Sequence, residues 1–456
     1  MADFGALSSL GLGSQGALNY DIIDKLKKAD EDAIIKPIDS KISLDKKRED
    51  ALANLTTLLA TLKGSASTLS YDNIYSKVAV DTTGSSATAT VQDGVSSQTI
   101  NLDVANIATN DVQESDSFSS EDSTFTSGAD TLKFELASGE SFSIDVDENT
   151  TISQLEEMIN DNSNGTISAS ILNVGGDNPY KLVIKSTQTG ADNAITVSST
   201  GGGSAADDLN LTTVGSGAQD ANFTYNGISI TRSTNDISDL ITGVDIKLID
   251  SGTTTIKISQ DTDSLKDSVK SFISAYNDLI DNLDETTKYD AKTKQQGIFQ
   301  GVSQIRGIKY DINNTVFEYD TSGVSLADFG ITQNSTGHLE LDESTFDNKI
   351  ATDPNAVKDF FKGGTETHPE DGLFVKLNDK LQSIFMDSYS EVKLYKNYLD
   401  SDLKSLEDQK DAQTKQIENK YNILAKKFAA YDNIISTFNA QSQSLQMQIQ
   451  SFLTNK

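Results

Sequence analysis

The sequence predicts a multidomain α+β protein whose β-rich head domains are inserted between N- and C-terminal helical, coiled-coil arms. Near the C-terminus apolar residues recur every seven positions, at Ile417, Leu424, Tyr431, Phe438, Leu445 and Phe452. Near the N-terminus the same period links Leu52, Leu59 and Ala66, interleaved with Leu55, Leu62 and Leu69. The middle of the chain is rich in Thr, Ser, Gly and Asp and alternates apolar with polar residues. Heptad seams require partner helices, so the pattern indicates assembly rather than catalysis.

Composition narrows the possible functions. The 456 residues suffice for two to four domains. With 37 basic and 68 acidic residues the net charge is −31, which argues against nucleic acid and anionic membranes as partners. The absence of cysteine excludes disulfides, zinc–thiolate sites and thiol nucleophiles. We expect neither a Sec signal nor membrane insertion, because no suitable basic or long apolar segment occurs.

The N-terminal arm starts with a glycine- and serine-rich stretch, residues 1–18, and a helix is expected after Asn19. Pro37 is expected to interrupt or kink this helix, because a proline inside a helix removes one backbone hydrogen bond. The helical pattern resumes at Ile38 and continues to about Leu69 through the leucine heptads.

From about Lys77 the period changes to the alternation of strands. A hairpin is expected around Ser138-Gly139, and Thr151 and Gln154 have the capping-box spacing that opens a short helix over 152–160. Gly201-Gly-Gly-Ser204 is interpreted as a hinge or linker. Residues 76–261 hold 27 acidic and 7 basic residues, as expected of a solvent-facing head. Further strands are expected near 166–173, 181–186, 194–198, 223–231, 244–249 and 254–259.

Helical periodicity returns at Asp263, and Asp353-Pro354 predicts an N-cap followed by a first-turn proline. From Leu373 onward helices dominate to the C-terminus. Four domains follow from these patterns. They are a terminal coiled-coil segment 1–40 that pairs with 431–456, a helical leg 41–75 plus 263–430, a β head 76–110 plus 200–262, and a β-rich inserted head domain 111–199.

The heptads allow two interpretations. A helical core within one molecule explains Leu52–Leu69, whereas the Gln- and Ser-rich segment 431–456, with its narrow apolar stripe, favours a seam between molecules. Burial of such a seam roughly offsets the entropy of ordering it only when a partner covers it. We therefore expect about 40 N-terminal and about 25 C-terminal residues to be mobile in the free monomer and ordered in the assembly.

Three chemical motifs are set aside. Gly11-Leu-Gly13-Ser-Gln-Gly16 matches G-x-G-x-x-G, but no strand precedes it and no βαβ unit surrounds it. His338 and His368, the only histidines, lack ligand-spaced partners. Asp145-Val-Asp147-Glu-Asn149 lacks the glycine and distant glutamate of a calcium loop and is interpreted as a strand end and turn. No catalytic residue, cofactor or metal site is predicted, although carboxylate pairs are too common here to exclude a hydrolase.

Three ordered segments carry a family resemblance. They are Gly11–Leu26 followed by Pro37 and the leucine-rich helix, Thr131–Ile171 together with Tyr180–Val197 (which includes Thr189–Thr196), and Phe272–Ile280 followed by Tyr289-Asp-Ala-Lys-Thr and Gly337–Asp342. Together they resemble the flagellar filament-capping family, also called hook-associated protein 2 or FliD. The middle segment is similar to the flagellin-type motif inserted in the head of that family. The lead-in at Gln15–Ala17 is one residue longer than the common pattern.

The resemblance implies an extracellular structural protein at the tip of the bacterial flagellar filament, exported by the flagellar type III apparatus. It implies a ring-shaped homo-oligomer beneath which flagellin subunits fold and insert, with an export chaperone and hook-filament junction proteins as further partners. Contacts within the assembly or with the filament are expected at apolar residues of both ends: Leu7, Leu10, Leu12, Ile22, Ile23, Leu26, Tyr431, Ile434, Ile435, Phe438, Leu445, Ile449 and Phe452.

Two other functions stay open. A flagellin-like or hook-filament junction subunit also hides its ends in coiled coil, but it polymerises into open helical arrays instead of a closed ring. A secreted adhesin would use the acidic β head to bind host glycans in cell adhesion, although no residue pattern identifies a glycan pocket.

Overall fold

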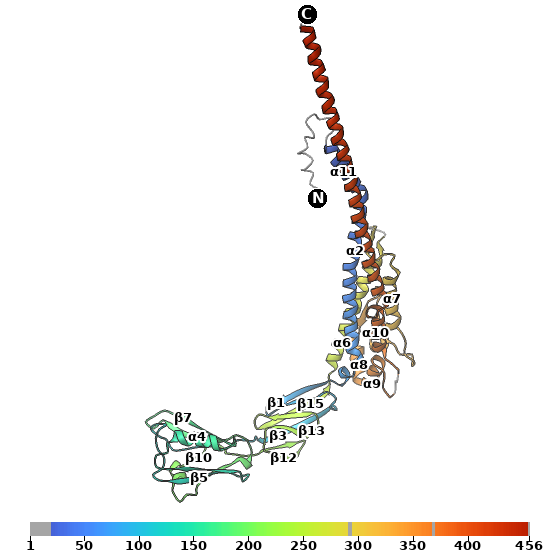
Figure 1. The fold of residues 1–456 in the computed structure, drawn as a ribbon. Helices are drawn as coiled ribbons and strands as arrows, with labels where there is room; N and C mark the ends of the chain where they lie inside the picture. Colours follow the sequence, from blue (N-terminus) through green and yellow to red (C-terminus); the bar gives the residue numbers. More distant parts are fainter. Residues whose placement is uncertain (1–19, 291–293, 367–369, 455–456) are drawn as a thin grey trace. The chain divides into compact units, whose positions relative to one another are not determined.

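The structure, a computed structural model, describes residues 20–290, 294–366 and 370–454 (Figure 1). The chain forms two compact units, one from residues 1–71 and 266–456 and the other from residues 72–265. Helices dominate the first unit and strands the second. The predicted α+β class, with β-rich domains inserted between helical arms, is confirmed.

The helical unit is built around the long helices at the two ends of the chain. The heptad residues Leu52, Leu55, Leu59, Leu62, Ala66 and Leu69 are all buried, and Phe272 and Phe361 both meet Phe374 edge-on. These leucines therefore form a core within the molecule. The helices are α2 (Tyr20–Ser70), α6 (Thr262–Thr287), α7 (Ser303–Val316), α8 (Glu343–Thr352), α9 (Pro354–Phe361), α10 (Leu373–Leu381), the π-helix η3 (Gln382–Met386) and α11 (Glu391–Thr454).

Short elements complete this unit. The predicted cap of α9 is confirmed, since the Asp353 side chain accepts a hydrogen bond from the Ala356 amide and Pro354 begins the helix. The remaining elements are β16 (Tyr289–Asp290), β17 (Gln295–Gln296), η2 (Leu326–Phe329), β18 (Ile331–Gln333) and β19 (Leu339–Leu341).

Helix α2 continues through Pro37, so the expected interruption of the helix is wrong. The lost backbone hydrogen bond is offset by tertiary packing immediately after the proline. Ile38 and Ile42 are buried against Leu403 and Leu406 of α11. Burial of a large aliphatic side chain contributes about 1.5–3 kcal/mol, which is comparable to the penalty of about 3 kcal/mol for an internal proline.

The β-rich unit starts with α3 (Asn73–Ser76) and contains two modules with separate cores. The first module has a five-stranded sheet of order β1-β15-β3-β11-β12 and a three-stranded sheet of order β13-β14-β2. Ile100, Phe223 and Ile256 lie in its core. Its strands are β1 (Val78–Gly84), β2 (Ala87–Val91), β3 (Gln98–Asn106), β11 (Ala221–Tyr225), β12 (Ile228–Arg232), β13 (Asp236–Ile241), β14 (Val244–Leu248) and β15 (Gly252–Gln260).

The single strand expected over 223–231 is wrong, because the chain turns at Asn226-Gly227 into two paired strands, β11 and β12. Both turn residues have positive φ, 47° and 83°. An Asn-Gly pair favours this two-residue hairpin turn.

The second module is inserted between β3 and β11. The predicted hairpin is confirmed by antiparallel β5 and β6, and the capping box by the reciprocal hydrogen bonds of Thr151 and Gln154. Its sheets have the orders β10-β4-β8-β7 and β6-β5-β9. The elements are β4 (Val112–Glu114), β5 (Asp130–Leu136), β6 (Ser141–Val146), α4 (Ile152–Asn162), β7 (Ile167–Asn173), β8 (Tyr180–Ser186), η1 (Ala191–Asn193), β9 (Ile195–Ser199), α5 (Ala205–Leu209) and β10 (Thr212–Thr213).

The segment Gly201–Ser204, interpreted from sequence as a hinge, is instead wrapped around Asp130. The Asp130 carboxylate accepts hydrogen bonds from the amides of Gly201, Gly203 and Ala205 at 3.0, 3.2 and 3.1 Å. A Cβ on Gly201 would lie 2.5 Å from a backbone nitrogen, so only glycine fits. Leu209 packs in the core of the inserted module, which therefore extends beyond the expected boundary at residue 199.

Candidate assembly surface

The two terminal helices of the helical unit, α2 and α11, pack antiparallel (Figure 1). Ile23 near the start of α2 is buried against Ile417, Tyr421 and Ala425. Because Ile38 and Ile42 pack further back along α11, the described part of segment 1–40 lies on residues 403–428. The expected pairing of this described part with residues 431–456 is therefore wrong.

Polar contacts along the pair fix its register. The Asp30 carboxylate lies 2.7 Å from Lys420 Nζ and accepts a hydrogen bond of 2.9 Å from the Tyr421 hydroxyl. Hydrogen bonds from Lys420 and Tyr421 lower the pKa of Asp30, so this carboxylate stays ionised at neutral pH. Lys410 and Asp39 form a second ion pair between the helices at 2.7 Å. Only one alignment of α2 and α11 satisfies both ion pairs.

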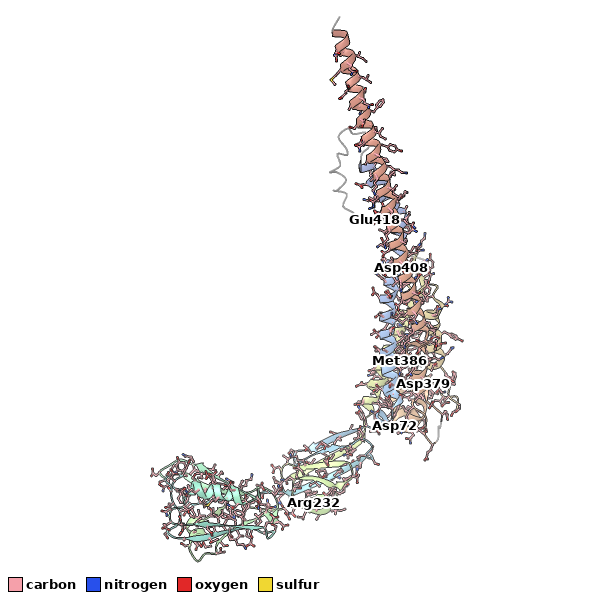
Figure 2. The ribbon with its side chains drawn as sticks, in the orientation of Figure 1. Asp72, Arg232, Asp379, Met386, Asp408 and Glu418 are labelled. Carbon is pink, nitrogen blue, oxygen red and sulfur yellow. The ribbon has the colours of Figure 1, made fainter. Side chains whose placement is uncertain are left out.

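Beyond the residues that α2 covers, α11 carries an exposed apolar stripe, here called the C-terminal strip. Phe438 is 71% exposed and Ile434 63%. Spacings of three, four and seven residues place the side chains on one face of the helix, over about 27 Å at 1.5 Å per residue. Figure 2 shows α11 and its side chains continuing past Glu418. The C-terminal strip consists of Tyr431, Ile434, Ile435, Phe438, Leu445 and Ile449.

The segment that carries the C-terminal strip has almost no charge. Between residues 431 and 454 the only charged side chain is Asp432, and Gln, Ser and Asn fill most of the other positions. By contrast, the preceding part of α11 carries the ion pairs to α2. The strip therefore has the chemistry of a helix face that packs against another apolar helix, without charged groups that select a partner.

The other predicted contact residues differ in their exposure to solvent, and some lie outside the described residues. Ile22 and Leu26 on α2 are about half exposed, and their spacing of four residues places them side by side on the helix. Ile23 is only 1% exposed, because it already packs against α11 of the same chain. Leu7, Leu10 and Leu12 lie outside the described residues, as does the side chain of Phe452. The predicted mobility of both ends in the free monomer stays a prediction.

The sequence-based interpretation missed Ile423 and Met447 on α11, which are also largely exposed. Both lie off the heptad positions, so a search for the seven-residue period passes over them. The 3.6-residue period of a helix is the only sequence pattern that locates these two side chains on α11. Met447, two residues from both Leu445 and Ile449, points about 200° away from the strip.

Of the motifs considered for chemistry, those at His338 and Asp147 lie among the described residues, and Gly11–Gly16 lies outside them. His338 Nε2 lies 2.7 Å from Asp281 Oδ1, and His368 lies outside the described residues. Asp147 accepts hydrogen bonds from Asn149 and Thr150 in the turn that precedes α4. In the described ranges no three His, Cys, Asp or Glu residues are grouped to hold a metal ion, and no helix there has the length and apolarity to cross a membrane.

Comparisons with known proteins agree with this architecture. A model of the flagellar hook-associated protein 2 N-terminus matches residues 16–111, and a model of the C-terminus of the same family matches residues 218–440. The chain belongs to the flagellar hook-associated protein 2 family. The two matched ranges include α2 and most of α11.

Two of the relatives in this family match over nearly their whole length, and a third matches over part of it. Flagellar hook-associated protein 2 of Helicobacter pylori J99 is 27% identical over 685 aligned residues that cover 99% of both chains. The protein of that name from Escherichia coli K12 is 27% identical, with 99% of this chain and 100% of the relative covered. That of Campylobacter jejuni is 30% identical over 80% of this chain and 65% of the relative.

A solved structure shows the same fold. The D1–D2–D3 domains of the flagellar cap protein from Escherichia coli superpose with a TM-score of 0.53 at 24% identity, covering 76% of this chain and 99% of that chain. This likeness shows that the chain shares the fold of those domains.

Proposed function

We propose that this chain forms the cap at the distal tip of the flagellar filament and promotes the folding and insertion of exported flagellin subunits. The observation that carries the proposal is the C-terminal strip, an apolar and nearly uncharged helix face with most of its side chains exposed to solvent. An apolar face of this size needs a partner. In a protein of the flagellar hook-associated protein 2 family, neighbouring copies and the filament are the partners available to cover this apolar face.

We further propose that several copies close into a ring, with the helices α2 and α11 as legs and the β-rich modules as the plate. Ile22 and Leu26 give each leg a second exposed apolar patch, on α2. Residues 1–19 precede α2 and would add Leu7, Leu10 and Leu12 to these contacts. Export through the flagellar type III apparatus, with a chaperone before export, is part of the same proposal.

Deletion of the gene tests the capping role. The deletion strain should have short or absent filaments and should release unpolymerised flagellin into the medium. Normal filaments with altered attachment to surfaces would instead support the adhesin, and loss of flagellin export would place the protein earlier in the flagellar apparatus. Helical fibres grown from the purified protein would favour a flagellin-like or junction subunit.

The role of the C-terminal strip in self-assembly is tested in solution. Phe438→Asp combined with Leu445→Asp places two charges in the strip, and desolvation of a carboxylate in an apolar contact is strongly unfavourable. The oligomer measured by analytical ultracentrifugation should dissociate to monomer. The matched control is Met447→Asp, which adds a carboxylate to an equally exposed position on the opposite side of the same helix. Equal effects of strip and control variants would contradict the proposed contact.

A further inference from the structure

The inserted module of the β-rich unit is joined to the first module by two connecting segments, residues 107–111 and 214–219. The two segments pair with each other, since Thr109 and Gln219 exchange backbone hydrogen bonds of 3.0 and 3.3 Å. A two-stranded ribbon is at best marginally stable by itself. The connecting segments alone would therefore leave the two modules free to move relative to each other.

A loop of the inserted module supplies a third attachment. This docking loop, residues 189–193, lies within the segment that resembles the flagellin-type motif. The Thr189 hydroxyl donates a hydrogen bond of 2.6 Å to the Ser233 carbonyl, which lies between β12 and β13 of the first module. The Ala191 amide donates a hydrogen bond of 2.8 Å to the carboxylate of Asp220, directly before β11. The inserted module thus contacts the first module outside the two connecting segments.

The docking loop is itself held firmly in the inserted module. The Asn193 side-chain amide donates to the Thr189 carbonyl at 2.9 Å, which closes the loop on itself. The Ser138 amide donates to the Asp192 carbonyl at 2.8 Å. Ile195, two residues after the loop, is buried in the core of the module. A force on the docking loop is therefore passed to the whole inserted module.

Gly190 allows the close approach of the docking loop to the first module. Its φ is 106°, in the region that favours glycine. A Cβ at this position would lie 2.6 Å from Ser233 Cβ and 2.9 Å from Ser233 O. Ser233 follows Arg232, which ends β12 and is labelled in Figure 2. The Gly190 amide also donates to the Thr109 carbonyl at 3.1 Å, so the loop is tied to a connecting segment as well.

The turn that receives the docking loop also holds a connecting segment. Asn235, two residues after Ser233, accepts a hydrogen bond of 2.8 Å from the Ala108 amide and donates one of 2.9 Å to the Ala108 carbonyl. Ala108 is buried in the core of the first module. The docking loop and the connecting segment are thus fixed to the first module at the same place.

We propose that the docking loop locks the two modules of the β-rich unit into one rigid body, and that Gly190 is the residue that permits the contact. The lock acts within one chain, so it holds whether or not the capping role is correct. In a cap whose plate is made of these modules, it would make both modules respond to a load as one body.

The distance between two spin labels, one on each module of the full-length protein, tests the lock. Because the chain has no cysteine, Asp93→Cys in the first module and Asp177→Cys in the inserted module create the only labelling sites, both in exposed loops. An excess of unlabelled protein removes distances between copies. Double electron–electron resonance should then give a single narrow distance peak. A broad distribution in this otherwise wild-type protein would overturn the proposal.

Gly190→Ala in the same labelled protein should replace the narrow peak by a broad distribution, because the added Cβ collides with Ser233. The matched control is Gly176→Ala. Gly176 also has a positive φ, 90°, but a Cβ there would meet no atom within 4 Å. Both substitutions therefore strain the backbone, and only Gly190→Ala adds the collision. Equal distance distributions in the two variants, whether narrow or broad, would contradict the proposed role of Gly190.

Asp220 offers a milder test that leaves the glycine in place. Asp220→Ala removes the acceptor of the Ala191 amide, whereas Asp220→Asn keeps a side-chain oxygen that can accept it. Hydrogen exchange of residues 189–193 should be about fivefold faster in Asp220→Ala, the effect of about one net hydrogen bond. In Asp220→Asn it should stay close to the wild-type rate. Wild-type exchange of the docking loop in Asp220→Ala would show that the loop is not held by the first module.

Discussion

Replacing Ile417 by alanine tests whether α2 and α11 are held together by the seam described above. Ile417 is 4% exposed and packs in the same cluster as Ile23, whereas Ile423 on the same helix is 57% exposed. The change removes about three carbon groups, each of which contributes about 0.8 kcal/mol when buried. Ile417→Ala should therefore destabilise the pair by about 2 kcal/mol, at the low end for a core position because a two-helix seam can partly collapse.

The assay is hydrogen exchange of residues 20–42 and 403–428 in the full-length protein. A loss of about 2 kcal/mol corresponds to about 30-fold faster opening, since about 1.4 kcal/mol changes an equilibrium tenfold. Exchange in the buried helix α6 should not change. Ile423→Ala is the matched control and should stay within about 0.5 kcal/mol of the wild type. Equal acceleration by the two substitutions, or none by Ile417→Ala, would refute the described seam.

Two further predictions concern the inserted module. Thr151→Ala removes the side-chain half of the capping box of α4 and should lower the stability of this module by about 1 kcal/mol in denaturant unfolding, with Thr151→Ser restoring most of it. Asp130→Asn should free the Gly201–Ser204 segment to exchange its amide hydrogens, because an amide replaces the carboxylate that these backbone groups bind. Hydrogen bonds from Ser199 and the backbone lower the pKa of Asp130 from 3.8 to about 2, so its stabilisation is complete above the unfolded value and is lost as pH falls toward about 2. Retained protection of the segment below that pH, or in Asp130→Asn, would contradict this role.

Local signals in the sequence predicted the local structure well. The capping box of Thr151 and Gln154 and the N-cap at Asp353 satisfy backbone groups within one turn, so their spacing alone determines the geometry. The leucine heptads from Leu52 to Leu69 were open to two interpretations in the sequence. The structure resolves them as core because the surrounding helices cover them.

The features that the sequence did not predict depend on distant residues. Gly201–Ser204 has the composition of a linker, and nothing near it reveals that Asp130, about 70 residues earlier, organises it. Likewise Pro37 is tolerated because Leu403 and Leu406 lie opposite. Asn226-Gly227 is a different case, because this pair is itself a typical signal of a hairpin turn. The prediction nevertheless placed one strand across it, where the structure has two.

In the candidate assembly surface, too, the local pattern was predicted and the contacts between distant residues were not. Heptad spacing identified the apolar face of α11, but it could not tell which part α2 covers. That depends on the register set by Asp30 with Lys420 and Asp39 with Lys410, two ion pairs that join residues about 370–390 positions apart. For this reason the buried Ile23 was grouped with the exposed Ile22 and Leu26.

The most direct test of the account is to complement the gene-deletion strain with strip variants and measure flagellin in filaments and in the medium. Phe438→Asp with Leu445→Asp should leave filaments short and release flagellin, as in the deletion, while Met447→Asp should restore normal filaments. Each variant must be exported and must keep the wild-type circular dichroism of its β-rich unit. Full rescue by the strip variant, with filaments of wild-type length, would contradict the claim that the C-terminal strip anchors the cap.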